Sequence, residues 1–407
     1  MNILHLSGYG VKAKVNNLKS RSELAITDGR EDYKTKPETY NFRPRKMPYD
    51  TIIIDGHSGY ISLQAFHWLS RNKIPVFILD FEGSIISSIL PPTPVRADVR
   101  IAQMQAAADV AKRFNVAYAL VKAKIQRSLD VLQWLGDRYD IDSKMRLVKG
   151  EALSLFKAKS VRDVRAVEGR VALRYWQTVQ SILPEWCDFQ GRMTGSHNNN
   201  AVDPVNLTLN YAYGVLEGEC RKIVNTVGLE PSIGFLHEFS NYQTKQSLVY
   251  DLQEPFRWIA DVTVLEAFES GVLDLKDFYF LGDDYRYRLD VDAKRRFLTL
   301  LKERFNEGTR YRGGIRKWDT IIQLKTLELA RYLTGKSKDV NFVEPGPNLV
   351  RNDSREMRSR ILQLSQGEAK TLGIGKSTLH YLRKHARGDK SFKTYRKVAE
   401  RIGTRLR

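Results

Sequence analysis

Residues 203–237 read DPVNLTLNYAYGVLEGECRKIVNTVGLEPSIGFLH, a pattern typical of one long helix that ends in a tight loop. Asp203 supplies an N-cap side chain, Pro204 is favoured at the first helical position, and Gly228 provides a stop. The sequence therefore predicts a helix over residues 204–227. Its apolar residues recur every three or four positions and form one face, made of Tyr211, Val215, Leu216, Ile223, Val224 and Val227.

Two acids in this helix have different surroundings. Glu219 falls in the middle of the apolar face, whereas Glu217 lies off it, one turn before Arg221, where we expect an exposed ion pair. A carboxylate at the position of Glu219 is buried unless the face borders a cleft. Burying an unpaired carboxylate costs several kcal/mol. Glu219 therefore requires a cation, a metal ion or a strong hydrogen-bond donor beside it.

Three further polar side chains follow the helix. The loop GLEPSIGFLH, residues 228–237, is shaped by Pro and two Gly and ends in His237. Within residues 247–254, Asp251 and Glu254 stand three positions apart, so they share a helix face. A lone histidine is often a core residue, and acids often compensate the dipole of a helix N-terminus. Both of these structural interpretations stay open beside a functional one.

Glu219, His237, Asp251 and Glu254 thus lie on two neighbouring helices and the loop that joins them. Oxygen ligands with one imidazole suit Mg²⁺ or Mn²⁺, and neither of the two cysteines has the spacing of a thiolate metal site. A hard divalent cation polarises a phosphodiester and stabilises the charge that develops in phosphoryl transfer. We therefore predict that these four residues form a metal site for phosphoryl transfer on a nucleic-acid backbone.

Composition favours a globular protein that binds a polyanion. The chain has 407 residues, 42% of them apolar, and a net charge of +19, which suits two or three domains and excludes bulk disorder. Residues 351–407 contain 16 Lys and Arg against five acids and so carry +11 of that charge. Basic side chains also serve solubility alone. Nucleic acid is the partner that the concentration of charge favours.

Pattern changes along the chain predict three parts. Residues 1–92 alternate apolar and polar positions between turns and predict a small β domain with one short helix at residues 62–69. After a Pro-rich break, residues 97–334 carry long helical patterns and predict an all-α domain. A polar linker rich in Pro and Gly, residues 335–350, precedes a small basic domain over residues 351–407. The predicted fold class is therefore α+β.

The basic domain has the pattern of a helix-turn-helix. A glycine turn at residues 373–375 separates a short helical pattern from a second one over residues 377–385. A protein-docking module is the alternative. If the second helix enters a major groove, the residues that contact DNA are Lys376, Thr378, His380, Tyr381, Arg383, Lys384 and Arg387. In the helical domain we expect DNA contacts from Lys222, Lys245 and Arg257.

Separated motifs occur in a fixed order along residues 1–330: SGYG at 7–10, IDGHSG at 54–59, ILPP at 89–92, LNYAYGVL at 209–216, GLEP at 228–231, GFLHE at 234–238 and DLQEPFR at 251–257. Together they resemble the CRISPR-associated adaptation integrases. Glu168-Gly169, Tyr175-Trp176 and Asn206 also fit this pattern, and we expect them to serve packing and helix positioning. With its helix-turn-helix tail, the chain is similar to the casposases, which insert the ends of casposon transposons into a target.

The resemblance implies a β domain that mediates dimerisation, a helical catalytic domain, and a metal site built from Glu219, His237 and either Asp251 or Glu254. The implied activity is the metal-dependent joining of a 3′-hydroxyl end to a target phosphodiester, by a homodimer or higher oligomer on double-stranded DNA. Two alternatives remain: an adaptation integrase that inserts spacers into a CRISPR array, and a non-catalytic DNA-architectural protein.

Apolar runs in the sequence are short. They stop far below the ~18–20 residues that a membrane span requires, and residues 1–4 do not begin a signal peptide. We therefore expect no membrane segment and a cytoplasmic location.

Overall fold

The structure, a computed structural model, describes residues 1–18, 21–30, 36–56, 58–80, 83–93, 96–192, 203–237, 246–281, 286–347, 349 and 365–367. The chain divides into two compact units, Met1–Pro347 and Asn348–Arg407. Every element described below belongs to the first unit. The predicted helix-turn-helix, with its seven DNA-contacting residues, lies outside the described residues, as does Lys245.

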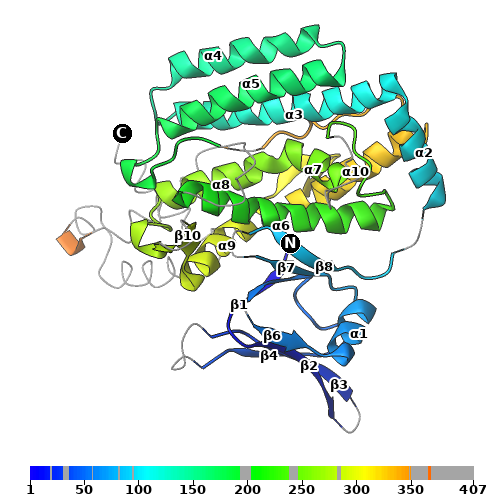
Figure 1. Cartoon of the computed structure of the whole chain (residues 1–407), viewed down its shortest axis with the longest axis vertical. Coiled ribbons are helices and arrows are strands. Elements are labelled where there is room, and N and C mark those ends of the chain that lie inside the picture. Colours follow the sequence, from blue (N-terminus) through cyan, green and yellow to red (C-terminus); the bar gives the residue numbers. More distant parts are fainter. Residues whose placement is uncertain are drawn as a thin grey trace. The chain divides into compact units, whose positions relative to one another are not determined.

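Two four-stranded sheets form the N-terminal part of this unit, as expected for residues 1–92 (Figure 1). The first has the order β1-β5-β7-β8, with bounds Ile3–Gly8, Thr51–Gly56, Val76–Leu79 and Ile85–Ile89. The second has the order β4-β3-β2-β6, with bounds Thr39–Phe42, Arg21–Thr27, Val11–Leu18 and Gly59–Ile61. Helix α1, Leu63–Arg71, begins after the N-cap Ser62 and confirms the short helix predicted here.

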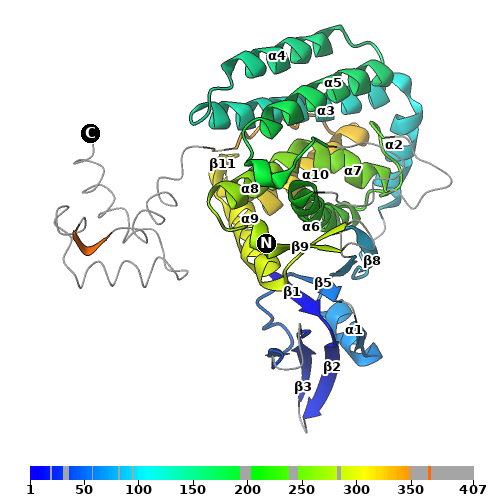
Figure 2. The same ribbon diagram turned by 60° about the vertical axis from the view of Figure 1, so that its left-hand side comes forward.

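Helices make up most of residues 97–334. They are α2 (Ala97–Ala108), α3 (Val110–Gly136), α4 (Asp142–Leu153), α5 (Val161–Gln180), α6 (Pro204–Val227), α7 (Ser247–Gln253), α8 (Arg257–Glu269), α9 (Val291–Asn306) and α10 (Trp318–Leu333). Short 3-10 turns lie at Ser154–Lys157, Glu185–Cys187, Glu254–Phe256 and Leu275–Asp277. Figures 1 and 2 show α3, α4 and α5 as one layer, with α6 between that layer and the strands. Within the described ranges, no helix is both long enough and apolar enough to cross a membrane.

Helix α6 has the ends that the sequence predicts. The Asp203 side chain accepts the amide N–H of Asn206, Pro204 occupies the first turn, and Gly228 ends the helix with a φ of 87°. Most of its residues are buried, so α6 is packed on more than one side. This central position lets its opposite faces contact different parts of the unit.

Two short hairpins interrupt the part that the sequence pattern predicts as all-α. Strands β9 (Phe278–Leu281) and β10 (Arg286–Leu289) pair antiparallel, as do β11 (Thr309–Tyr311) and β12 (Gly314–Arg316). Each strand has only three or four residues, so its period-2 pattern is hidden between the longer helical patterns beside it. The α+β class holds, with these strands added to the helical part.

The sheets and the helices belong to one compact unit and share buried polar contacts. Asp55 of β5 pairs with His5 of β1 at 3.2 Å and with Lys294 of α9 at 2.8 Å. The Tyr211 hydroxyl of α6 lies 2.9 Å from Nε2 of His5. A buried charged cluster therefore joins the first sheet to α6 and α9.

Residues 336–347, which the sequence predicts as part of a linker, lie against the helices. Phe342 is buried. Arg127 of α3 donates to the Val343 carbonyl at 2.8 Å, and Lys325 of α10 donates to the Asn341 carbonyl at 2.9 Å. An apolar side chain and two buried cations thus attach this segment, which we call the strap, to the helical body.

Candidate active site

The loop after α6 is held by a buried side chain from α2. Gln103 donates to the carbonyls of Glu230 and Ile233 at 3.0 and 2.7 Å, and it accepts the Glu230 amide at 2.7 Å. At the other end of the loop, a Cβ on Gly234 would meet the Asp251 carboxylate at 2.9 Å, so only glycine permits this approach. These contacts fix the loop that ends in His237.

Asp251 organises the end of this loop. It is fully buried on α7, and its carboxylate accepts the backbone N–H groups of Phe235 at 2.5 Å, Leu236 at 2.9 Å and His237 at 2.9 Å. Its Oδ1 also lies 2.7 Å from Nδ1 of His237. Because a carboxylate only accepts, Nδ1 donates in this contact, and Nε2 is the nitrogen left to face Glu254. These four contacts occupy both oxygens of Asp251, so the role of Asp251 is to orient the histidine.

Glu254 lies one turn further along, in the 3-10 turn that follows α7, and is buried. Its Oε1 is 3.2 Å from Nη2 of Arg257 and 4.0 Å from Nε2 of His237, and its Oε2 is 2.6 Å from Nζ of Lys124. Burial alone would raise the pKa of Glu254, but Arg257, Lys124 and His237 outweigh it and lower the pKa to about 2. Glu254 is therefore an anion at neutral pH.

Glu168 of α5 joins this group through Lys124 of α3, whose ammonium pairs with both Glu168 and Glu254. The sequence pattern assigns Glu168 to packing, whereas the structure places its carboxylate in an ion pair at the site. Burial would lower the pKa of Lys124, but the two carboxylates outweigh it and raise the pKa. Helices α3 and α5 and the 3-10 turn after α7 thus bring two carboxylates onto one lysine, and the imidazole of His237 lies beside the second carboxylate.

A pocket of about 480 Å³ opens beside these groups. Its polar lining includes Lys124, Glu168, Arg192, Tyr213, Glu254 and Arg257. The guanidinium of Arg257 stacks over the Tyr213 ring at 4.8 Å, with Arg192 over the same ring at 5.4 Å. The pocket is therefore lined by both the carboxylates and fixed positive charge, an arrangement that suits a phosphate group next to a metal.

A buried acid holds the aromatic wall of the pocket. Asp261 of α8 accepts the hydroxyl of Tyr213 at 2.5 Å and that of Tyr175 at 3.0 Å. Burial raises the pKa of Asp261, and the two hydroxyls and Arg257 oppose this rise. Asp261 therefore fixes the ring on which Arg257 rests.

Glu219 does not join the other three predicted residues. It shares a face of α6 with Tyr211, eight residues before it, and with Lys222, three residues after it, and that face contacts the first sheet. Lys222 lies 2.7 Å from Glu219, 3.7 Å from Asp50 and 3.4 Å from the Thr51 hydroxyl.

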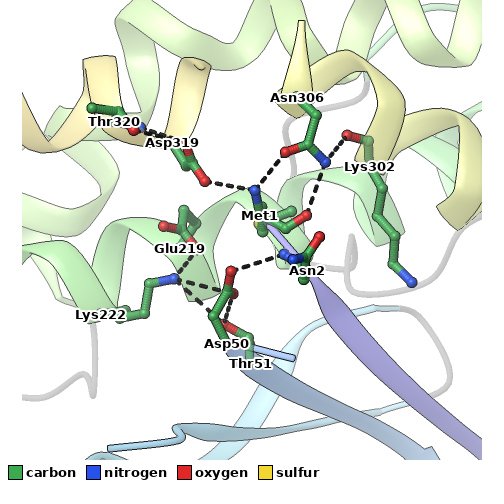
Figure 3. Close-up of polar contacts among 10 residues, drawn as sticks. All are labelled: Met1, Asn2, Asp50, Thr51, Glu219, Lys222, Lys302, Asn306, Asp319 and Thr320. Carbon is green, nitrogen blue, oxygen red and sulfur yellow. Dashed lines mark hydrogen bonds and ion pairs between the residues drawn. The ribbon is translucent and has the colours of Figure 1, made fainter. Parts of the chain in front are cut away.

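Figure 3 shows Glu219 and Lys222 close to the amino group of Met1, which contacts Asp319 at 2.6 Å and Asn306 at 2.8 Å. Burial raises the pKa of Glu219, and Lys222 opposes this rise. The expected partner of Glu219 is thus a lysine at the contact with the sheet.

The opposite face of α6 points toward the pocket. Tyr213 and Glu217 are four residues apart on this face, and Glu219 is rotated by about 200° from Glu217 in a regular helix. Glu217 does pair with Arg221, as the sequence predicts, but both side chains are largely buried rather than exposed. Local periodicity correctly predicts the helix, but the tertiary fold determines what packs against each of its faces.

Two of the expected DNA contacts in the helical domain can be placed. Arg257 lines the pocket and pairs with Glu254. Lys222 pairs with Glu219 on the sheet side of α6, away from the pocket. Of these two, Arg257 alone stands beside the candidate site.

The chemistry of these donors suits a hard divalent cation. Two carboxylates and one neutral imidazole nitrogen are ligands that Mg²⁺ and Mn²⁺ accept. Oε2 of Glu254 is a buried oxygen without a hydrogen bond, although it pairs with Lys124. As the side chains stand, no group of three His, Cys, Asp or Glu residues in the described ranges is close enough to hold a metal ion. The Lys124 ammonium occupies the space between the two glutamates.

Residues 22–303, more than half of the chain, match the family described as CRISPR associated protein Cas1. The chain belongs to the Cas1 family. Curated Cas1 relatives include CRISPR-associated endonuclease Cas1 1 of Archaeoglobus fulgidus, 30% identical over 72% of this chain and 88% of the relative. Another is CRISPR-associated endonuclease Cas1 of Methanopyrus kandleri, 32% identical over 67% of this chain and 81% of the relative.

Solved structures also resemble this Cas1 chain. A casposase bound to integration product is 35% identical, with a TM-score of 0.81 over 89% of this chain and 99% of the casposase chain. Cas1 of Thermotoga maritima, TM1797, superposes with a TM-score of 0.67 at 17% identity, over 82% of this chain and 97% of that chain, which shows the shared fold. The family and casposase resemblance stated from the sequence is thereby confirmed.

Proposed function

We propose that this chain is a DNA integrase of the casposase type, which joins the 3′-hydroxyl end of a mobile-element duplex to a target DNA by transesterification. The observation that carries this proposal is the likeness to the casposase bound to integration product, at 35% identity over 89% of the chain. The pocket supports it, because carboxylates and fixed cations meet there as phosphoryl transfer requires.

For the metal, Mg²⁺ or Mn²⁺, we propose Glu168, His237 and Glu254 as ligands, with Asp251 as the residue that orients His237. This set keeps His237 and Glu254 from the sequence prediction, chooses Glu254 over Asp251, and replaces Glu219 by Glu168. A bound divalent cation would polarise the phosphodiester and stabilise negative charge in the transition state.

The protein side chains contribute charge and position. In the reaction, the attacking 3′ oxygen loses its proton as it bonds to phosphorus, and the 3′ oxygen of the target strand leaves and takes up a proton. Arg257, fixed by Tyr213 and Glu254, presents a permanent positive charge to the phosphate. Burial of the site under α3 and α5 strengthens each of these electrostatic interactions.

The substrate we propose is double-stranded DNA, both element ends and target. It is bound by a homodimer or higher oligomer, and the N-terminal sheets mediate the dimerisation. The basic residues 351–407 are proposed to read DNA sequence as a helix-turn-helix. Spacer insertion into a CRISPR array is the second candidate function, because the curated relatives bear the name CRISPR-associated endonuclease Cas1. Terminal inverted repeats beside the gene favour the first function, and a CRISPR array favours the second.

A strand-transfer assay tests the proposal. The protein is incubated with a labelled duplex that carries a 3′-hydroxyl and with supercoiled plasmid, in Mn²⁺ or in chelator. We expect label covalently joined to plasmid only with Mn²⁺ and only when the 3′-hydroxyl is present. Binding without joining would show a DNA-architectural protein instead.

A further inference from the structure

Lys124 is the one residue that connects the two glutamates of the site in the described part of the chain. It extends from α3, and its Nζ pairs with Glu168 on α5 and lies 2.6 Å from Oε2 of Glu254. Its side chain is only 19% exposed. One ammonium group therefore neutralises two carboxylates that belong to different elements.

The two glutamates depend on this lysine to different degrees. Glu254 also contacts Arg257 at 3.2 Å, whereas Glu168 has no other ion pair with a described residue. Without Lys124, Glu168 and Oε2 of Glu254 would face each other as like charges at a largely buried place, which is unfavourable. Lys124 thus stabilises the arrangement of the two carboxylates in the protein when no metal is bound.

The proposed metal needs the same carboxylates. An ammonium and a divalent cation cannot both lie between Glu168 and Glu254. Their positive charges repel each other, and both need the same carboxylate lone pairs. Arg257 is not in this conflict, since its guanidinium binds Oε1 and rests on the Tyr213 ring at 4.8 Å. Lys124 has a flexible four-carbon stem and borders the pocket of about 480 Å³, so it has room to withdraw.

We propose that Lys124 is an internal cation that holds the metal-free site together and competes with the divalent metal for Glu168 and Glu254. This inference rests on the proposed function, which supplies the metal. Metal binding then includes the cost of displacing Lys124. The withdrawn ammonium enters the pocket, where a DNA phosphate would attract it, so DNA strengthens metal binding and metal strengthens DNA binding by the same factor.

The test is a titration of the full-length protein with Mn²⁺, in which electron paramagnetic resonance reports the free ion. Lys124→Met keeps most of the length of the side chain and removes its charge. Lys122→Met is the matched control, because Lys122 lies two residues away on α3 and is exposed. We expect Lys124→Met to lower the dissociation constant for Mn²⁺ by about tenfold or more, and Lys122→Met to leave it unchanged.

Two further measurements separate the possible outcomes. Thermal melting should show Lys124→Met less stable than wild type in chelator and more strongly stabilised by Mn²⁺. Adding a short DNA duplex should tighten Mn²⁺ binding to wild type but not to Lys124→Met. If Lys124→Met does not fold, Lys124→Gln, which retains hydrogen-bond donors, replaces it in both measurements.

Equal or weaker Mn²⁺ binding by a folded Lys124 variant overturns the role of Lys124. The proposed metal site survives that result if Glu168→Gln and His237→Ala still weaken Mn²⁺ binding. If neither of these two variants changes Mn²⁺ binding, the proposed metal site itself is wrong, and the inference about Lys124 fails with it.

Discussion

Asp251 holds both the backbone and the ring of His237. Oδ1 of Asp251 lies 2.9 Å from the backbone nitrogen of His237 and 2.7 Å from Nδ1 of the same residue. The carboxylate is fully buried and also accepts two other backbone N–H groups of the same loop. The position of the imidazole is therefore set by a residue that has no oxygen left for a metal. Metal-bound histidines commonly receive such a carboxylate partner.

Asp251→Asn is predicted to lower strand transfer by about 10- to 100-fold and to weaken Mn²⁺ binding by a similar factor, as loss of an orienting partner does. The amide keeps the shape but replaces an accepting oxygen by a donor, so it cannot accept from all four groups. Rates at saturating DNA and Mn²⁺ titration measure the two effects. DNA affinity should be nearly unchanged. A fully active Asp251→Asn enzyme with normal Mn²⁺ affinity would contradict the orienting role.

The contacts of the strap predict where the chain can be truncated without loss of thermal stability. Deletion of residues 348–407 should leave the melting temperature nearly unchanged, because the first compact unit ends at Pro347. Deletion from Val340 onward should lower it by several degrees, since Phe342 is removed and Arg127 and Lys325 no longer have their carbonyl partners. Differential scanning calorimetry of the two truncations compares them. Equal melting temperatures would show that the strap contributes nothing to stability.

The truncation at Pro347 also tests the proposed helix-turn-helix. Residues 351–407 carry +11, so their removal should weaken DNA binding and reduce the slope of log affinity against log salt by roughly 0.9 for each phosphate that the tail neutralises. Metal-dependent joining should persist, while the choice of site should relax. Arg383→Ala with Lys384→Ala should reproduce much of this weakening. Unchanged affinity, salt slope and site choice would indicate a protein-docking tail and favour the adaptation-integrase alternative.

The buried pair of Asp55 and Lys294 predicts a pH-dependent contribution to stability. Burial would raise the pKa of Asp55, but His5 and Lys294 outweigh it and hold the pKa below its ordinary value of 3.8. Lys294→Met leaves the carboxylate buried without its lysine and should reduce the free energy of unfolding at pH 7 by about 3–5 kcal/mol. A folded-state pKa below the unfolded value stabilises the protein above that unfolded value, and the contribution disappears as the pH falls through the folded pKa.

Urea unfolding of wild type and Lys294→Met at several pH values measures this difference. It should be full at neutral pH and shrink steadily in acid, toward the lowered pKa of Asp55. Surface Lys276→Met, which affects an exposed pair with Asp274, is the control and should change little at any pH. A difference that is independent of pH would mean that Lys294 acts by packing alone.

Much of the fold follows from local pattern. The caps at Asp203 and Gly228 correctly give the ends of α6, and alternation gives the N-terminal strands, because each signal is complete within a few residues. The hairpins β9–β10 and β11–β12 were missed because strands of three or four residues are too short for a clear period. The strap was predicted as a linker because one buried Phe342 hardly changes a polar composition.

The site could be predicted only in part, for a related reason. His237, Asp251 and Glu254 meet because the chain between them is short, and sequence spacing detects that. Glu168 reaches them from α5, 69 residues before His237, and no local spacing reports such a contact. A buried position indicates that Glu219 needs a partner but does not identify it, and in the structure that partner is Lys222. In the sequence, Glu168 stands out by its fit to the family pattern, and that fit does not distinguish packing from a role in the site.

We propose that the metal site contains Glu168, His237 and Glu254 and does not contain Glu219. Strand transfer by Glu168→Gln and Glu219→Gln, with equal DNA binding confirmed for each, distinguishes the two glutamates. We predict that Glu168→Gln abolishes Mn²⁺-dependent joining, whereas Glu219→Gln, which only alters a contact with Lys222 at the sheet, retains most of it. An inactive, folded Glu219→Gln beside an active Glu168→Gln would show that Glu219, and not Glu168, belongs to the site.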